Sequence, residues 1–409
     1  MGDFMAKIAS RVHSIEVSAI KQMPIIASRY SGTIRLDQGI PDFPMPKPAR
    51  DYVAEAFRTD KGITQYTLQP GMTQLREAVS GSIKDKYGVA VDPENELFLS
   101  AGSIEGLLCT ALTFLERGDA AALFSPAYEP HIQQVRLAEA EPVYFPLEEG
   151  SWRPDIGALE NELKKGAIRL IYVCNPANPT GTVFTVGEVN EIAMLALTHD
   201  AVVVADEAYD FLAYDKPYTS FLPLFPEMKK NLIVTKTWSK SLAATGLRIG
   251  YVVACDEYLR EMLKVHDSAV ISAPTPGQYA ALWALRNPNE AEKAVEEFRS
   301  ELRRRRDLMH ERIRGIPQMF EASTKPEGAY YFFPRMAFGG DSVDFASTLV
   351  REARVSVVPG APFGPGGEYH VRMMFGAPVD MINMAFDRLQ QYAASEDFRA
   401  YVKRVQKIS

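Results

Sequence analysis

Residues 97 to 255 alternate short apolar runs with longer amphipathic segments, and this alternation constrains the fold more than any other feature. The runs are rich in β-branched residues. Strands that alternate with helices in this way form a mostly parallel sheet covered by helices. We therefore predict an α/β fold with a mostly parallel seven-stranded sheet, whose strands are ELFLSAG, AALFSP, PVYFPL, IRLIYVCNP, AVVVADEAY, LIVTKTWSK and IGYVVAC.

The chain has 409 residues, which exceeds the length that a single hydrophobic core usually stabilises. We therefore expect two domains. Residues 1–45 are predicted to form an N-terminal arm and part of the small domain, 46–287 the large domain, and 288–409 a smaller α+β domain. The arm includes RLDQGIPDFPMPKP, whose prolines exclude a regular helix and suggest a segment that crosses the cleft. Amphipathic patterns predict helices at 103–116, 129–138, 155–164, 186–199, 288–314 and 378–395, and EGAYYFFP and VSVVPG are further predicted strands.

The composition is that of a globular protein, with 46% hydrophobic and 24% charged residues and a net charge of −7. The densest basic run, Arg303 to Arg306, lies among acidic residues and is predicted to be a solvated helix face, so we expect no nucleic-acid partner. No run is apolar enough for a signal peptide or a membrane span, which predicts a cytoplasmic protein without a membrane partner. The widely spaced Cys109, Cys174 and Cys255 are predicted to be buried thiols, and the histidines lack metal-ligand spacing, so no metal site is expected.

Polar residues cluster where the predicted strands end, which is where ligands bind in open α/β sheets. Lys240 follows one strand; it is a candidate nucleophile, a phosphate ligand or an ordinary surface lysine. Asp206 ends another strand and suggests either a functional carboxylate or a structural ion pair. Ser103 begins a helix, where it is either part of an anion site or a simple N-cap. Tyr128 follows a further strand, and its ring either packs within the protein or stacks on a cofactor.

These residues belong to motifs that occur in a fixed order. G-S-x-E-G, P-x-Y, N-P-x-N-P-T-G, D-E-x-Y, T-W-S-K, G-L-R-I-G-Y and V-R-M follow one another along the chain. In this order and spacing they resemble the class I/II (fold-type I) aminotransferases, which depend on pyridoxal 5′-phosphate (PLP), along nearly the whole sequence. The resemblance implies a PLP enzyme that moves amino groups between amino acids and 2-oxo acids.

The resemblance also assigns roles at the cofactor ring. Lys240 matches the lysine that forms a Schiff base with PLP and then carries the substrate's α-proton. Asp206 matches the carboxylate that pairs with the pyridinium nitrogen. Tyr209 and Asn178 match the two donors to the phenolic oxygen of the ring, and Tyr128 matches the aromatic residue that stacks on the ring.

Further residues match the groups that hold the phosphate and the substrate. The phosphate cup is matched by Gly102, Ser103, the backbone N–H of Ile104, Thr237 and Arg248. Tyr66 resembles a tyrosine that reaches the phosphate of the other subunit, so a homodimer is implied. Arg372 matches the arginine that binds the substrate α-carboxylate, a position that would otherwise be a surface strand arginine. The backbone at Gly39 matches the segment that closes over this carboxylate, where Asn178 also contributes.

The substrate side chain and the reaction type stay open at this point. Some relatives that prefer acidic substrates carry a lysine where this chain has Ile104, and the apolar SAVISAPTPGQYAALWAL favours neutral or aromatic substrates, with aspartate as a further candidate. The same constellation also suits a PLP-dependent carbon–sulfur lyase or related synthase. A regulatory protein of this fold would need an additional DNA-binding domain, and a nicotinamide oxidoreductase would need a G-x-G-x-x-G fingerprint after an early strand.

Overall fold

The computed structural model describes residues 8–407 except 16 and 18. Residues 1–7 of the expected N-terminal arm and residues 408–409 lie outside this description. The largest sheet has seven strands in the order β2-β8-β7-β6-β5-β3-β4. Its strands are β2 (Leu97–Ser100), β3 (Ala120–Ser125), β4 (Glu141–Pro146), β5 (Ile168–Cys174), β6 (Val202–Asp206), β7 (Leu232–Thr237) and β8 (Gly250–Val253). β8 pairs antiparallel with β2 and β7, and the other pairs are parallel, which confirms the predicted sheet.

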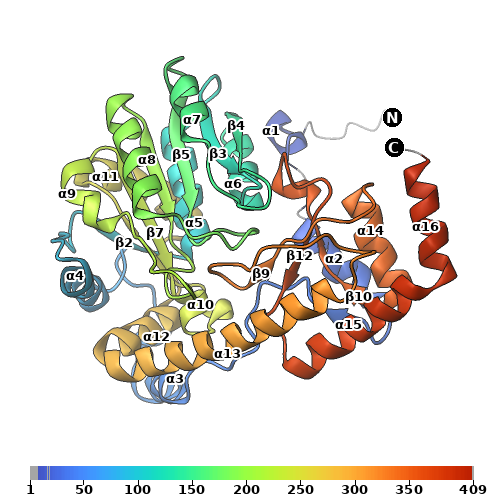
Figure 1. Ribbon diagram of the computed structural model, residues 1–409. Coiled ribbons are helices and arrows are strands. Elements are labelled where there is room, and N and C mark those ends of the chain that lie inside the picture. Colours follow the sequence, from blue (N-terminus) through green and yellow to red (C-terminus); the bar gives the residue numbers. More distant parts are fainter. Residues whose placement is uncertain (1–7, 16, 18, 408–409) are drawn as a thin grey trace, which may run out of the picture.

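Helices cover both faces of this sheet (Figure 1). In β6, Val202 and Val204 face one layer of helices, whereas Val203 and Ala205 face the other, so the whole strand is buried. The first layer is α5 (Ser103–Phe114), α6 (Glu129–Leu137) and α11 (Asp256–Val270). The second is α4 (Thr73–Tyr87), α7 (Ile156–Leu163), α8 (Val186–Thr198) and α12 (Thr275–Arg286). The helices predicted at 103–116, 129–138, 155–164 and 186–199 are therefore confirmed to within a few residues.

The C-terminal part builds a second core around two small sheets. β1 (Ile34–Arg35) pairs parallel with β10 (Val355–Ser356), and β12 (Val371–Met374) pairs antiparallel with β11 (Val358–Pro359) and β9 (Tyr331–Phe332). The long helix α13 (Pro288–Arg314) has the predicted bounds and runs along the lower part of Figure 1, from beneath the large sheet towards the C-terminal part. The other helices here are α2 (Ala19–Ser28), α14 (Ser342–Thr348), α15 (Val379–Ala394) and α16 (Glu396–Gln406). Short or peripheral helices complete the chain: α1 (Ser10–His13), α3 (Lys47–Thr59), α9 (Phe225–Met228) and α10 (Trp238–Ser241).

The prediction that Arg303 to Arg306 forms a solvated face is wrong for half of the run. Arg303 and Arg304 are exposed, but Arg305 and Arg306 are buried. Arg306 pairs with Asp215 at 2.5 Å, and Arg305 donates to the carbonyl of Gly376 at 2.7 Å. These partners are distant in sequence, so charge alternation along the helix cannot reveal them.

The cysteines and the long helices agree in part with the sequence-based expectations. All three thiols are free; Cys109 and Cys255 are buried, whereas Cys174 is partly exposed. Among the described residues, no helix has both the length and the apolar character needed to cross a membrane.

Candidate active site

The predicted site residues follow strands whose carboxyl ends lie at one edge of the large sheet. Asp206 is the last residue of β6, and Lys240 lies in the short helix α10 directly after β7. Ser103 begins α5 after β2, Tyr128 lies between β3 and α6, and Asn178 follows β5. Because β2, β3, β5, β6 and β7 all point the same way, the sheet brings these five residues to a common edge.

Lys240 reaches into this site rather than into solvent. Its Nζ donates a hydrogen bond to the backbone carbonyl of Gly39 at 2.6 Å. Burial, followed by the positive charges of Arg372 and Arg248, lowers the pKa of Lys240 to about 7, and Asp206 opposes this shift. An amine that is partly uncharged near neutral pH can act as a nucleophile, and its hydrogen bond to Gly39 favours this interpretation over that of an ordinary surface lysine.

Gly39 lies in the proline-containing N-terminal segment and contacts Lys240 at the edge of the large sheet. Its carbonyl also accepts a hydrogen bond from the hydroxyl of Tyr330 at 2.9 Å. A Cβ at Gly39 would lie 3.0 Å from the hydroxyl of Tyr331, so the close approach favours glycine. Neither tyrosine was identified from the sequence.

Asp206 is buried, with 2% of its surface exposed, and its partner is a histidine that the motifs did not identify. The Nε2 of His131 lies 3.1 Å from one carboxylate oxygen. The other oxygen accepts a hydrogen bond from the backbone N–H of Ala208 at 3.3 Å. Both carboxylate oxygens thus have a partner within the protein, and the charge of Asp206 acts on the nearby amine of Lys240.

Tyr209 follows Asp206 by three residues and packs against the C-terminal part of the chain. Its hydroxyl lies 2.9 Å from the hydroxyl of Tyr331, and its ring meets that of Tyr330 edge-on at 5.3 Å. Burial, followed by the neighbouring tyrosines, raises the pKa of Tyr209 well above its ordinary value. The hydroxyl therefore keeps its proton at neutral pH and remains a hydrogen-bond donor.

Arg372 lies in β12 with 1% of its surface exposed, so the surface-arginine interpretation is also wrong. Its guanidinium donates to the side-chain oxygen of Asn178 at 3.0 Å, and its Cζ lies 4.3 Å from the ring centroid of Tyr331. Its Nε is buried without a hydrogen-bond partner. Within the described part of the chain no carboxylate pairs with this cation. A buried guanidinium with spare donors is suited to bind the carboxylate of a ligand.

A concentration of donors surrounds the start of α5. Arg248 donates to the carbonyl of Ala101 and to the hydroxyl of Ser239, at 3.1 and 3.3 Å. The hydroxyl of Thr237 lies 2.9 Å from that of Ser239. Gly102, with φ +75°, passes so close to Arg248 that a side chain there would collide with the guanidinium.

The N-cap of α5 is Gly102, and Ser103 is the first residue of the helix, so the alternative of Ser103 as a simple N-cap is wrong. The first N–H groups of a helix have no partner within it, and here they lie beside Arg248. This end of α5 therefore has the free N–H donors and the positive potential that an anion such as a phosphate requires.

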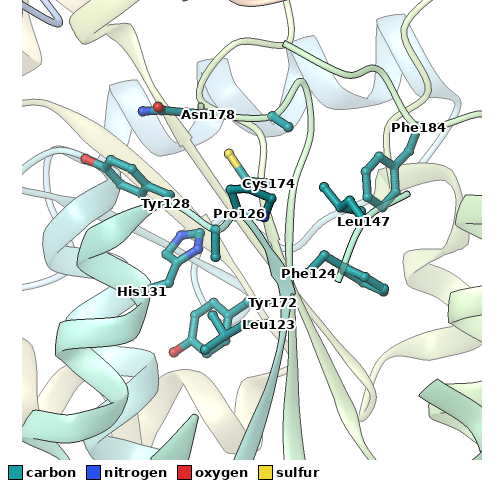
Figure 2. A pocket seen from close by; sticks show the side chains of 12 residues that line it. Leu123, Phe124, Pro126, Tyr128, His131, Leu147, Tyr172, Cys174, Asn178 and Phe184 are labelled. Atoms are coloured by element: carbon teal, nitrogen blue, oxygen red, sulfur yellow. The ribbon is translucent and has the colours of Figure 1, made fainter. Parts of the chain in front are cut away.

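Tyr128 lies next to His131, with their rings edge-on at 5.2 Å. Figure 2 shows both side chains together with Asn178 and Cys174. These residues line a small cavity of about 20 Å³. The charges of Asp206 and Arg372 act on Tyr128, whose pKa is raised mainly by burial. The ring of Tyr128 therefore belongs to the same site as the carboxylate and the guanidinium.

Tyr66 is the predicted site residue that does not join this cluster within the chain. It is 76% exposed and lines an open groove together with Ala101 and Ser272. Ile104, at the start of α5, is 39% exposed, and its carbonyl accepts a hydrogen bond from Gln134 at 2.9 Å.

Comparison with known proteins agrees with this arrangement. The family model described as aminotransferase class I and II matches residues 31–389. The chain belongs to this family. It is 32% identical over 388 residues to aromatic-amino-acid aminotransferase 2 of Thermococcus litoralis, a match that covers 94% of this chain and 97% of the relative. It is 33% identical over 391 residues to aspartate aminotransferase of Pyrococcus horikoshii, covering 95% and 98%.

The fold is similar to that of solved aminotransferases. Aspartate aminotransferase from Thermus thermophilus, solved with maleate, superimposes with a TM-score of 0.87 at 28% identity and covers 95% of this chain and 100% of that chain. Aromatic aminotransferase from Pyrococcus horikoshii superimposes with a TM-score of 0.81 at 33% identity, covering 90% and 98%. The predicted fold, the aminotransferase activity and the dependence on pyridoxal phosphate are thereby confirmed.

The residues of this site fit pyridoxal phosphate. The cofactor needs an amine for its aldehyde, an anion site for its phosphate and a carboxylate for its ring nitrogen. Lys240 has a lowered pKa, hydrogen-bond donors gather around Arg248 at the start of α5, and Asp206 is a buried carboxylate held by His131.

Proposed function

We propose that this aminotransferase holds pyridoxal phosphate through Lys240 and moves the amino group of an L-amino acid to a 2-oxo acid such as 2-oxoglutarate. The observation that carries the proposal is the position of Lys240. Its Nζ donates a hydrogen bond to the Gly39 carbonyl. The charges of Asp206 and Arg372 act on this amine, whose pKa is about 7. A proton can therefore be held or released at this nitrogen near neutral pH.

The side chains around Lys240 divide the remaining work. When bound, pyridoxal phosphate supplies an aldehyde that bonds to amines and a ring that accepts electrons from the substrate α-carbon. Asp206, held by His131, keeps a proton on the ring nitrogen. Tyr209 donates to the phenolic oxygen, and Lys240 moves the α-proton. Asn178 assists at the phenolic oxygen.

A second group of residues orients the cofactor and the substrate. The phosphate is bound by Arg248 and Thr237. It is also bound at the start of α5, by Gly102, Ser103 and the N–H of Ile104. Tyr128 stacks on the ring. Arg372, with its uncommitted Nε, binds the substrate α-carboxylate beside Asn178 and the Gly39 backbone.

The substrate side chain is proposed to be neutral or aromatic, with aspartate as a further candidate. Ile104 places an apolar side chain where a lysine would favour a second carboxylate, and Ala273 and Pro274 line the adjoining groove. Relatives named for aromatic amino acids and for aspartate are almost equally similar to this chain, at 32% and 33% identity.

We also propose a cytoplasmic homodimer in which Tyr66 serves the site of the other subunit. The open groove beside Tyr66 and the 76% exposure of its side chain support this arrangement. The free thiols support a reducing compartment. The proposed domains are the arm at 1–45, the large domain at 46–287 and the small domain at 288–409. One hydrophobic core around the large sheet and another around the small sheets support this division, and Tyr209 and Phe333 are among the residues that pack across its boundary.

The direct test incubates the purified holoenzyme with a panel of amino acids and follows the spectral change of its cofactor. Neutral or aromatic amino acids should convert the cofactor, and added 2-oxoglutarate should reverse the change. Lys240→Ala should abolish turnover, whereas Lys264→Ala, an exposed lysine paired with Glu261, should leave it unchanged. A borohydride-reducible adduct in Lys240→Ala would show that another lysine holds the cofactor.

A carbon–sulfur lyase of the same fold is the competing activity. Cystathionine supplied without any 2-oxo acid distinguishes the two. Release of pyruvate and ammonia under these conditions would contradict transfer as the main reaction, whereas dependence on an added 2-oxo acid supports it.

A further inference from the structure

Tyr331 lies where three parts of the proposed site meet. It begins β9, where it pairs with Met374 of β12, and only 1% of its surface is exposed. Its ring lies under the guanidinium of Arg372, 4.3 Å from Cζ. Its hydroxyl lies 2.9 Å from that of Tyr209 and approaches the backbone of Gly39.

The hydrogen bond between the two tyrosines has a direction that chemistry restricts. Each hydroxyl has one proton to donate and lone pairs to accept. The phenolic oxygen of the cofactor is an acceptor, so Tyr209 must donate its hydroxyl proton to this oxygen in order to bind the cofactor. The bond between Tyr209 and Tyr331 must then take its proton from Tyr331.

We propose that Tyr331 is a positioning residue: its hydroxyl donates to Tyr209 and thereby directs the proton of Tyr209 toward the cofactor's phenolic oxygen. This inference rests on the role proposed above for Tyr209. A hydroxyl that accepts a hydrogen bond is a stronger donor, because successive hydrogen bonds polarise one another. The guanidinium of Arg372 over the ring of Tyr331 acts in the same direction, because a nearby positive charge makes the hydroxyl proton easier to donate.

The proposal separates two functions within one side chain. The ring of Tyr331 packs against Arg372 and supports binding of the substrate carboxylate. The hydroxyl acts through Tyr209 on the cofactor. Tyr331→Phe removes the hydroxyl and retains the ring, so the two functions can be measured independently.

The experiment compares the holoenzymes of Tyr331→Phe, Tyr209→Phe, the double variant and wild type. The visible absorption of the bound cofactor is titrated against pH, and kcat and KM are measured for one amino acid. The hydrogen bond from Tyr209 withdraws charge from the phenolic oxygen, which otherwise helps to hold a proton near Lys240. Loss of this effect should raise the titration midpoint.

For Tyr331→Phe we expect a rise of roughly half a pH unit to one unit, with a lower kcat and a KM within about twofold of wild type. Tyr209→Phe should give a larger rise, and the double variant should match Tyr209→Phe alone. Tyr214→Phe is the matched control, since it removes another buried hydroxyl, which donates to the Ala329 carbonyl at 2.6 Å outside this network. Its midpoint should remain that of wild type.

The outcomes distinguish the two levels of the proposal. An unchanged midpoint in Tyr331→Phe, together with a shifted one in Tyr209→Phe, overturns the role of Tyr331 and leaves that of Tyr209. Additive shifts in the double variant also overturn it, because Tyr331 would then act independently of Tyr209. If Tyr209→Phe itself leaves the midpoint unchanged, the proposed function of Tyr209 is wrong.

Discussion

His131 and Asp206 form a buried pair behind the proposed position of the cofactor ring, with 3.1 Å between Nε2 and the carboxylate oxygen. The imidazole lies 4.9 Å from the ring of Tyr172 and is itself held in place by this packing. Asp206 is thus held in one orientation. Precise placement matters because a carboxylate acts on a ring nitrogen only within hydrogen-bond distance.

His131→Phe should therefore reduce turnover without releasing the cofactor. The variant retains an aromatic ring beside Tyr172 but removes a hydrogen bond worth about 1 to 2 kcal/mol, which corresponds to roughly a tenfold loss in kcat. Steady-state kinetics of the holoenzyme measure this loss. His310→Phe is the control, because His310 contacts the Ser323 carbonyl at 3.0 Å in the C-terminal core. Equal kcat values for both variants would contradict the role of His131.

The pH dependence of cofactor binding should follow Lys240. The uncharged amine reacts with the cofactor aldehyde, so the rate at which cofactor-free enzyme recombines with pyridoxal phosphate should rise with pH through about 7 and then level off. Positive neighbours favour the uncharged amine. Removing one, as in Lys21→Gln, should raise the pKa of Lys240 and slow recombination at pH 7.

The expected displacement for Lys21→Gln is a few tenths of a pH unit, because the side chain is exposed and its charge is screened. Lys47→Gln is the matched control, an exposed lysine paired with Asp51. Stopped-flow mixing across a pH series supplies the midpoints. A lower midpoint pH for Lys21→Gln than for wild type would contradict the sign of the electrostatic effect.

The large sheet and its helices could be predicted because each element is periodic and locally complete. α13 has the predicted bounds since Pro288 begins it and a long amphipathic pattern continues to Arg314. The places of Lys240 and Asp206 at one edge of the sheet were also predictable, because each lies next to the strand that positions it. In these cases neighbouring residues carry the information.

The residues that were missed depend on contacts distant in sequence. Tyr331 lies within EGAYYFFP, which was predicted as a strand, but its partner Tyr209 is more than a hundred positions away, so the strand alone does not reveal the contact. Arg306 is buried because Asp215 approaches from another element. His131 was closer to detection, since it lies one helical turn beyond Tyr128. Its partner, however, could be assigned only once β6 and α6 had been placed together.

Substrate preference should respond to Ile104. Ile104→Lys introduces a cation at the start of α5, where a second substrate carboxylate would be attracted. We expect kcat/KM for aspartate relative to phenylalanine to rise about tenfold, in line with the 1–3 kcal/mol that such contacts contribute. Leu112→Lys is the matched control, since it adds the same charge to the same helix at the same exposure of 39%. An equal change in both variants would indicate a general charge effect instead of a local contact.

Subunit mixing tests whether Tyr66 serves the partner's site. Lys240→Ala and Tyr66→Ala are each expected to be weakly active as pure dimers. If Tyr66 acts across the interface, a mixed dimer has one site with both defects and one site with neither. Random mixing of equal amounts makes about half of the dimers mixed, so about a quarter of wild-type activity should return.

The result differs if Tyr66 acts within its own chain. Each site of a mixed dimer then carries one defect, and mixing restores nothing. The exposure of Tyr66, 76%, and its position in an open groove beside Ala101 favour the first outcome. Mixing Lys240→Ala with Lys47→Gln is the control, because an active subunit should then add only its own activity in proportion to its amount. Activity that reappears only in the Tyr66→Ala mixture would show that the second subunit completes the site.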